Sequence, residues 1–183
     1  MMRRLVVGSL VLALAATVVG SLPSCASVPD RNRFTAVVAP DFAIYRANID
    51  LFLHKRCGTL DCHGQAGRGY RIYGYRGFRL YSQDAGLISG QQATTDQEIQ
   101  ANFDAIISIE PEEMSRLIAE NGENPNRLLF LRKPLNIERH KGGPSLAEDD
   151  EGYKCITAWL RAPKGGALTA TAKKDCDEAG KLP

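Results

Sequence analysis

The chain has 183 residues, of which 44% are hydrophobic and 24% are charged, and its formal net charge is +2. This length fits one domain with processing segments, and the composition excludes a disordered chain and a protein with several membrane spans. The small basic excess is spread along the chain, so it gives no reason to expect nucleic acid as a partner.

The N-terminus has the pattern of a bacterial export signal. Arg3 and Arg4 precede an apolar stretch over 5–20, and small residues follow before Cys25. The apolar stretch falls short of the roughly 20 residues that cross a membrane. We therefore predict that residues 1–24 are a signal peptide.

The end of this signal, Leu-Pro-Ser-Cys25, resembles the lipobox of bacterial lipoproteins. The resemblance implies that Cys25 is diacylated and becomes the mature N-terminus, with residues 25–38 as the lipidated N-terminus and tether. Several acyl chains are enough for stable attachment, so the domain is expected at a membrane of the cell envelope, on its periplasmic face. A simple secretory peptide that ends near a cysteine is the alternative.

The first element predicted after the tether is a helix. Phe42, Tyr45, Ile49 and Phe52 recur at steps of three and four, which marks one apolar helical face. This helix leads directly into the motif that carries the chemistry.

The motif Cys57-Gly-Thr-Leu-Asp-Cys62-His63 places two thiols before a histidine. Covalent haem attachment uses this order, because two sulfurs form thioethers to the porphyrin and the next histidine binds the iron. The usual spacing has two residues between the cysteines, and the four residues here resemble the rarer attachment sites of multihaem cytochromes. We predict haem thioethers at Cys57 and Cys62 and a proximal iron ligand at His63.

Three other interpretations fit parts of the motif. A zinc site would need the adjacent Cys62 and His63 to point at one ion, and no second Cys/His cluster supplies the missing ligands. A disulfide between Cys57 and Cys62, with His63 on the surface, suits an oxidising compartment and stays open. A catalytic cysteine would need a free thiolate where thiols tend to oxidise.

The segment over 64–77 is dense in Gly, Arg and Tyr, so it is predicted as an irregular loop along one edge of the haem. Guanidinium groups suit the two propionate carboxylates of haem, which Arg68, Arg71, Arg76 and Arg79 could serve, and we single out Arg71 and Arg76 as the expected contacts. Most of these four arginines are expected on a solvated face.

Further helices are predicted over 95–109, 111–119 and 125–132, the last two with prolines at their starts. Strand signals are poor, so the fold class is all-α with long irregular loops.

The last predicted helix ends before Pro163, and Ser145 with Glu148 has the pattern of a capping box for it. Cys155 in this helix and Cys176 in the tail form the remaining cysteine pair of an exported chain. We predict a structural disulfide between them, closing a loop of about 20 residues and contributing about 3 kcal/mol. The apolar face of the helix consists of Tyr153, Ile156, Trp159 and Leu160.

A haem iron bound by His63 alone would be open on one face, and three side chains are candidates for the distal ligand. His140 lies in a glycine-flanked loop far along the chain. Met114 is the runner-up and would raise the reduction potential, although a core methionine is the simpler interpretation. His54 lies only three residues before Cys57, where it cannot easily reach the other face.

Over residues 42–163 the chain resembles the cytochrome-c-like domains of planctomycete and myxobacterial envelope proteins. The resemblance implies a cytochrome c-like helical domain over 39–163, followed by a tail over 164–183. It also implies one covalent haem c, with His140 matching the family's histidine. The landmarks that carry it are Cys-Gly-Thr-Leu-Asp-Cys-His-Gly-Gln65, Asn124-Pro-Asn-Arg-Leu-Leu, Lys133-Pro-Leu, His140-Lys-Gly-Gly and Tyr153-Lys-Cys-Ile-Thr-Ala-Trp-Leu160.

These features predict a monohaem c-type cytochrome lipoprotein that transfers electrons in the cell envelope, more an electron carrier than an enzyme. Its expected partners are redox proteins and, through the lipid anchor, the membrane. A vacant distal position would instead permit a peroxidase-like or sensor role. The alternative from another class is a non-haem, disulfide-stapled envelope lipoprotein with a binding or scaffolding role.

Overall fold

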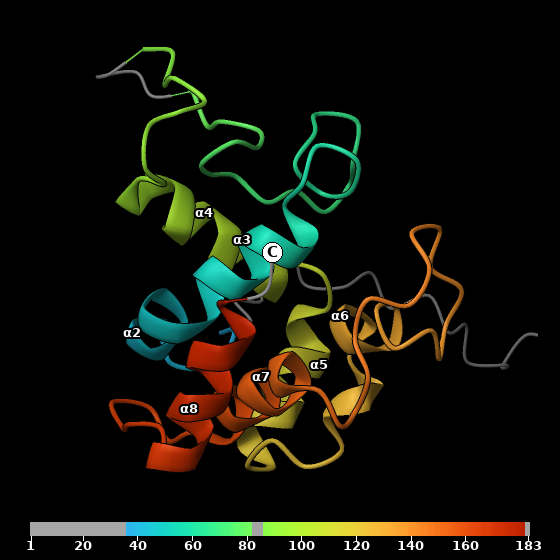
Figure 1. Ribbon diagram of the computed structural model, residues 1–183. Coiled ribbons are helices and arrows are strands. Elements are labelled where there is room, and N and C mark those ends of the chain that lie inside the picture. Colours follow the sequence, from blue (N-terminus) through green and yellow to red (C-terminus); the bar gives the residue numbers. More distant parts are fainter. Residues whose placement is uncertain (1–35, 82–85, 182–183) are drawn as a thin grey trace, which may run out of the picture. The chain divides into compact units, whose positions relative to one another are not determined.

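The computed structural model describes residues 36–81 and 86–181 (Figure 1). The predicted signal peptide over 1–24, the lipidation at Cys25 and most of the tether lie outside the described residues. From Val37 on, the chain forms one compact unit. None of the described helices combines the length and the hydropathy that crossing a bilayer requires.

The described residues are mainly helical and form no sheet, which confirms the all-α class. Their β-structure is limited to a single bridge between Tyr73 and Phe78. In chain order, the elements are α2 (Phe42–Ile44), the π-helical turn η1 (Tyr45–Ile49), α3 (Asp50–Cys57), α4 (Asp96–Ile107), α5 (Pro111–Ala119), the 3₁₀ turn η2 (Pro125–Arg127), α6 (Leu129–Arg132), α7 (Glu151–Arg161) and α8 (Ala170–Ala179).

The first helical segment runs from α2 through α3 and contains the π turn that the sequence did not predict. A π turn brings residues five apart onto one face. The Tyr45 hydroxyl accordingly donates to Asp50 Oδ1, five residues later, over 3.0 Å. The side-chain amide of Asn102 in α4 donates to the same oxygen over 3.0 Å, so the turn is tied to a second helix.

Trp159 of α7 lies at the centre of the core and is fully buried. Its ring centroid lies 5.3 Å from that of Tyr45 and 6.2 Å from that of Phe103. Its indole Nε1 donates to the carbonyl oxygen of Asp41 over 2.8 Å, and the Asp41 carboxylate accepts from the Ile44 amide at the start of α2. The last predicted helix is thus fastened to the beginning of the first.

The predicted starts of the middle helices are largely confirmed. Thr95 caps α4 and forms a capping box with Glu98, and α5 has the predicted bounds. The helix predicted over 125–132 is instead divided into η2 and α6, because Leu128 adopts an extended conformation with φ −72° and ψ 132°.

The predicted capping box of Ser145 and Glu148 is wrong. The cap of α7 is Asp150, whose carboxylate accepts from the Tyr153 amide over 2.7 Å. The Glu148 carboxylate accepts instead from the side-chain amide of Asn126. Helix α7 therefore begins at Glu151.

Part of the predicted tail over 164–183 is helix α8, which packs along α7 (Figure 1). A disulfide joins Cys155 of α7 to Cys176 of α8, with a Cα–Cα distance of 4.8 Å. Ala172, Cys176 and Ala179 are buried against the core. The buried face of α8 consists of small side chains, which explains why its sequence has no strong apolar periodicity.

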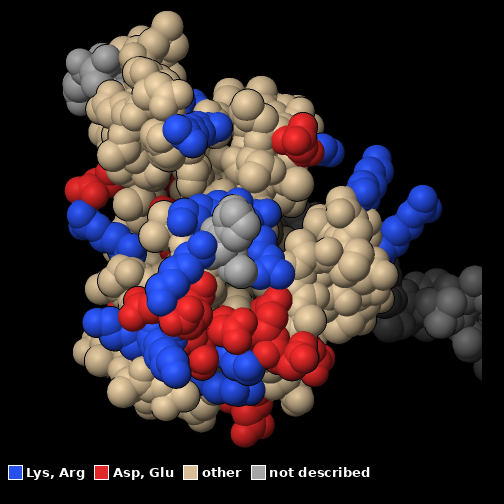
Figure 2. All heavy atoms as spheres, viewed as in Figure 1, with Lys and Arg blue, Asp and Glu red and all other residues tan. Residues whose placement is uncertain are grey.

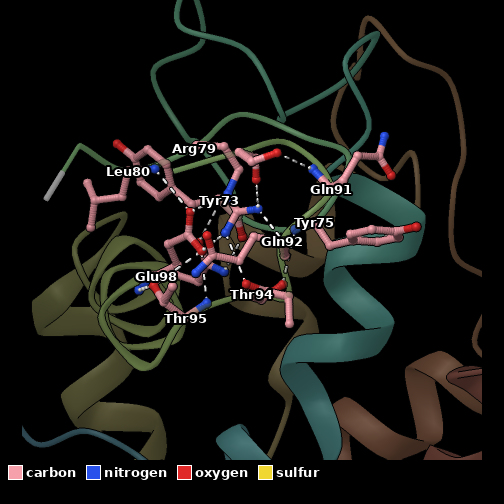
Figure 3. Close-up of polar contacts among 12 residues, drawn as sticks. Tyr73, Tyr75, Arg79, Leu80, Gln91, Gln92, Thr94, Thr95 and Glu98 are labelled. Carbon is pink, nitrogen blue, oxygen red and sulfur yellow. Dashed lines mark hydrogen bonds and ion pairs between the residues drawn. The ribbon is translucent and has the colours of Figure 1, made fainter. Parts of the chain in front are cut away.

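A buried ion pair holds the loop before α4 to that helix (Figure 3). Arg79 Nε and Nη2 each donate to Glu98 over 2.8 Å, and its other N–H groups donate to backbone carbonyls within 89–93. The side chains of Arg79 and Glu98 are 10% and 0% exposed. Arg79 is thus an exception to the solvated arginine face that we predicted for this segment.

Candidate functional site

The Cys-His motif follows α3 directly, and hydrogen bonds within its own backbone hold it in a turn. The His63 amide donates to the Cys57 carbonyl over 2.9 Å, and the amides of Cys62 and Gly64 donate to the Thr59 carbonyl over 3.0 and 2.9 Å. These hydrogen bonds fold the four residues between the cysteines into a compact turn. The longer spacing therefore still brings both sulfurs and the imidazole to one cavity.

Gly64, directly after His63, has no room for a side chain. A Cβ there would lie 2.0 Å from the carbonyl oxygen of Gly58. Gly64→Ala is expected to force the turn apart and to lower the free energy of unfolding by about 1–3 kcal/mol, which urea denaturation measures. Gly67→Ala is the matched control, because a Cβ at Gly67 meets no atom within 4 Å. Equal stability of the two variants would contradict this close packing.

The His63 ring is oriented by its own loop. Its Nδ1 lies 2.9 Å from the carbonyl oxygen of Tyr70, so Nδ1 carries the proton and donates, which leaves Nε2 free. The Tyr70 ring packs against the imidazole with centroids 4.8 Å apart. Burial lowers the pKa of His63, which favours the neutral ring. A neutral imidazole with a free Nε2 is the form that binds a metal ion.

His140 is held in the same way by a different loop. Its Nδ1 lies 2.7 Å from the carbonyl oxygen of Gly143, and the Gly143 amide donates back to the His140 carbonyl over 3.0 Å. The amides of 145–146 donate to the Pro134 carbonyl, which anchors this loop beside α6. His140 therefore also presents a free Nε2.

The rings of His63 and His140 are nearly parallel, at 8°, and their centroids lie 6.1 Å apart. An imidazole nitrogen binds a transition metal at about 2 Å, so two rings on opposite sides of one ion have centroids about 6 Å apart. The separation of the two rings thus fits one metal ion between them.

Both histidines line a cavity of about 540 Å³. Its wall also contains the sulfur-bearing side chains of Cys57 and Cys62. The remaining wall is largely apolar and comes from α3, α4, α6 and the loops that follow them. Its apolar members are Leu53, Tyr70, Ala105, Ile109, Leu129, Phe130, Pro134 and Leu146.

Cys57 and Cys62 are both free thiols. Burial raises the pKa of the Cys57 thiol to about 12, and the neighbouring Cys62 adds to the rise. Cys57 is therefore protonated at neutral pH, which does not suit a nucleophilic thiolate.

The other sequence candidates lie away from this cavity. Met114 is 2% exposed and belongs to the core packing of α5. His54 is also buried, and its Nε2 has no hydrogen-bond partner among the described residues. Arg71 and Arg76 do not line the cavity, and the Arg76 guanidinium lies 4.9 Å from the centre of the Tyr75 ring instead.

Four basic side chains lie near the site, and none of them was singled out from the sequence. Arg68, Lys133, Arg139 and Lys141 line a second hollow of about 630 Å³ beside the first. The sequence could have indicated two of them, because Arg139 and Lys141 flank the candidate ligand His140. Arg68 and Lys133 are brought there only by the folding of their loops.

Within residues 36–81 and 86–181, no group of three or more His, Cys, Asp or Glu side chains is placed to hold a metal ion. Cys155 and Cys176 form their disulfide outside the cavity. Comparison of the chain with known protein families, curated proteins and solved structures finds no match.

Proposed function

We propose that this protein is a monohaem c-type cytochrome lipoprotein that transfers electrons in the cell envelope. The observation that carries the proposal is the convergence of four side chains on one cavity. Cys57, Cys62 and His63 enter it from the motif, and His140 enters it from a loop far along the chain. This is the set of groups that covalent attachment and two axial ligands require.

The cavity suits the size and character of haem. Its volume of about 540 Å³ lies within the range of roughly 300–1,000 Å³ typical of cofactor sites. Aliphatic and aromatic side chains such as Leu53, Leu129 and Phe130 line it, as an apolar macrocycle needs. The 6.1 Å between the two imidazole centroids leaves room for one iron.

The chain's own groups define the chemistry of this site. A bound haem supplies a one-electron couple between ferric and ferrous iron. Tyr70 and Gly143 accept the Nδ1–H protons of the two imidazoles and so fix the tautomers that offer Nε2 to iron. The apolar wall excludes water and lowers the local polarity, which sets the potential together with the ligands.

Two histidine ligands favour electron transfer over small-molecule chemistry. If His63 and His140 both bound the iron of a haem, no position would stay open for a peroxide or a gas, so the site is proposed for an electron carrier. The export signal and the lipobox-like Leu-Pro-Ser-Cys25 support a location in the envelope, anchored to a membrane.

Haem staining of a denaturing gel tests this proposal. The full chain is expressed in cells that have a c-type maturation system. The purified protein is expected to give a haem-peroxidase band that the double variant Cys57→Ser/Cys62→Ser loses entirely. Cys25→Ser is the control, because it should release the protein from the membrane fraction without removing the band.

The alternative function has its own signature in the same preparation. A non-haem envelope module would give a colourless folded protein. Mass spectrometry would then find Cys57 bridged to Cys62 and no added macrocycle. That result would overturn the haem proposal.

A further inference from the structure

The second hollow beside the candidate site is strongly basic. It has a volume of about 630 Å³ and shares Cys62, His63, Lys133, His140 and Gly142 with the apolar cavity. The two histidines therefore line both the apolar cavity and the basic hollow. Its charged lining consists of Arg68, Lys133, Arg139 and Lys141, with Asp61 as its acidic member.

Three of these basic side chains lack a carboxylate partner. Lys133 forms an ion pair of 2.7 Å with Glu138. Arg68, Arg139 and Lys141 form no ion pair with any side chain in the described ranges. The hollow thus holds three uncompensated cationic groups against one carboxylate, that of Asp61.

Arg68 is the most firmly placed of the three. Its Nε donates to the Cys62 carbonyl over 2.9 Å, and its Nη2 donates to the Asp61 carbonyl over 3.0 Å. It is half-buried, and the rest of its guanidinium fork stays available. Arg139 and Lys141 are exposed on the loop before α7, and Figure 2 shows basic side chains that project outward on the side where this loop lies.

Such a hollow is complementary to a ligand with two carboxylates. Like charges gathered in a concave site repel one another and attract an anion. Guanidinium groups match the planar geometry of a carboxylate, and ammonium groups add a point charge. Haem has this chemistry on one edge only, because its two propionates leave the macrocycle on the same side.

We propose that the basic hollow binds the two propionates of the haem, with Arg68 as their principal partner and Arg139 and Lys141 beside it. This inference rests on the proposed function. It orients the cofactor, since the thioether at Cys57 lies in the apolar cavity, the thioether at Cys62 lies where the cavity and the hollow meet, and the carboxylates lie toward the basic side chains of the hollow. It also replaces Arg71 and Arg76 as the expected contacts, because neither lines the hollow.

The test compares Arg68→Gln with Arg71→Gln in the matured holoprotein. Both variants remove one positive charge from the same loop, but only Arg68 lines the hollow. In Arg68→Gln the propionate bending band of the resonance Raman spectrum is expected to shift. The pH-dependent step of the reduction potential should move to higher pH by about one unit, because a carboxylate that loses an adjacent cation titrates with a higher pKa. Arg71→Gln should leave both readouts unchanged.

A second variant covers the case in which Arg68→Gln disturbs the motif turn. Arg139→Gln/Lys141→Gln changes no hydrogen bond to the motif and should shift the same band and the same step. Unchanged readouts in both variants would overturn the inference, and so would equal shifts in Arg71→Gln. The proposed function would still stand in either case if the wild type gives a haem-stained band. A further outcome is a reduction potential that changes on addition of inorganic phosphate while the Raman band stays unmoved. That result would assign the hollow to a soluble anion and would also overturn the inference.

Discussion

Replacing His140 by alanine is expected to abolish the low-spin spectrum of the oxidised holoprotein and to let the reduced protein bind carbon monoxide. The imidazole lies 6.1 Å from that of His63, centroid to centroid, and both present Nε2. Removal of one ring therefore opens one face of the iron. Absorption and electron paramagnetic resonance spectra measure the loss, and the haem stain should persist because Cys57 and Cys62 are untouched.

Two further variants decide which side chain is the distal ligand. His140→Met should keep the low-spin state and raise the reduction potential on the order of 0.1 V, since axial ligands tune haem potentials over about 0.8 V. Met114→Leu should change neither, because Met114 is buried away from the cavity. A low-spin spectrum that survives His140→Ala but not Met114→Leu would contradict the assignment.

Removal of the Glu98 carboxylate is expected to cause the largest loss of stability. Glu98→Ala leaves the Arg79 guanidinium buried without its partner, which typically costs about 3–5 kcal/mol. It also removes an acceptor for the Thr95 amide at the start of α4 and for the Leu80 amide in the preceding loop. Urea denaturation followed by circular dichroism measures the change in the free energy of unfolding.

An exposed ion pair between η1 and the first residue of α4 provides the control. Arg46 and Asp96 lie 2.7 Å apart with side chains 52% and 74% exposed, so Arg46→Ala should cost less than about 1 kcal/mol. If the two variants lost the same stability, the buried pair would have no special role in the fold.

The contribution of Glu98 also depends on pH. Burial alone would raise the pKa of its carboxyl, but hydrogen bonds from Arg79, Thr95 and Leu80 outweigh burial and lower the pKa. A carboxyl with a lowered folded-state pKa stabilises the fold fully above its ordinary pKa. This contribution disappears as the pH falls through the folded-state pKa, so the wild type should lose its advantage over Glu98→Ala in acid.

Local signals predicted the middle helices well and the last helices less well. Thr95 with Glu98, and Pro111 at the start of α5, act within one turn, so the sequence alone defines those starts. The start of α7 was misplaced because several nearby polar residues can cap a helix, and the residue that does so, Asp150, also pairs with Arg56 of α3 over 3.2 Å. Helix α8 was missed because its packing uses small side chains and a disulfide rather than an apolar stripe.

The candidate site likewise has one part that the sequence predicted and another that depends on the tertiary fold. The Cys-His motif is contiguous, so the sequence alone predicted that its two thiols and its imidazole lie together. The approach of His140 to His63 depends on how two loops fold, and only a resemblance to other proteins indicated it. The burial of Arg79 and the position of Arg68 follow from loop hydrogen bonds that no periodicity encodes.

The half-buried thiol of Cys57 bears on the order of events during biogenesis. With a pKa of about 12, it stays in its unreactive, protonated form in the folded domain. A folded, haem-free chain would consequently be alkylated slowly by iodoacetamide at this position. The same protonation disfavours bond formation to a vinyl group after folding, so the assembly machinery should act on the exported chain before it folds.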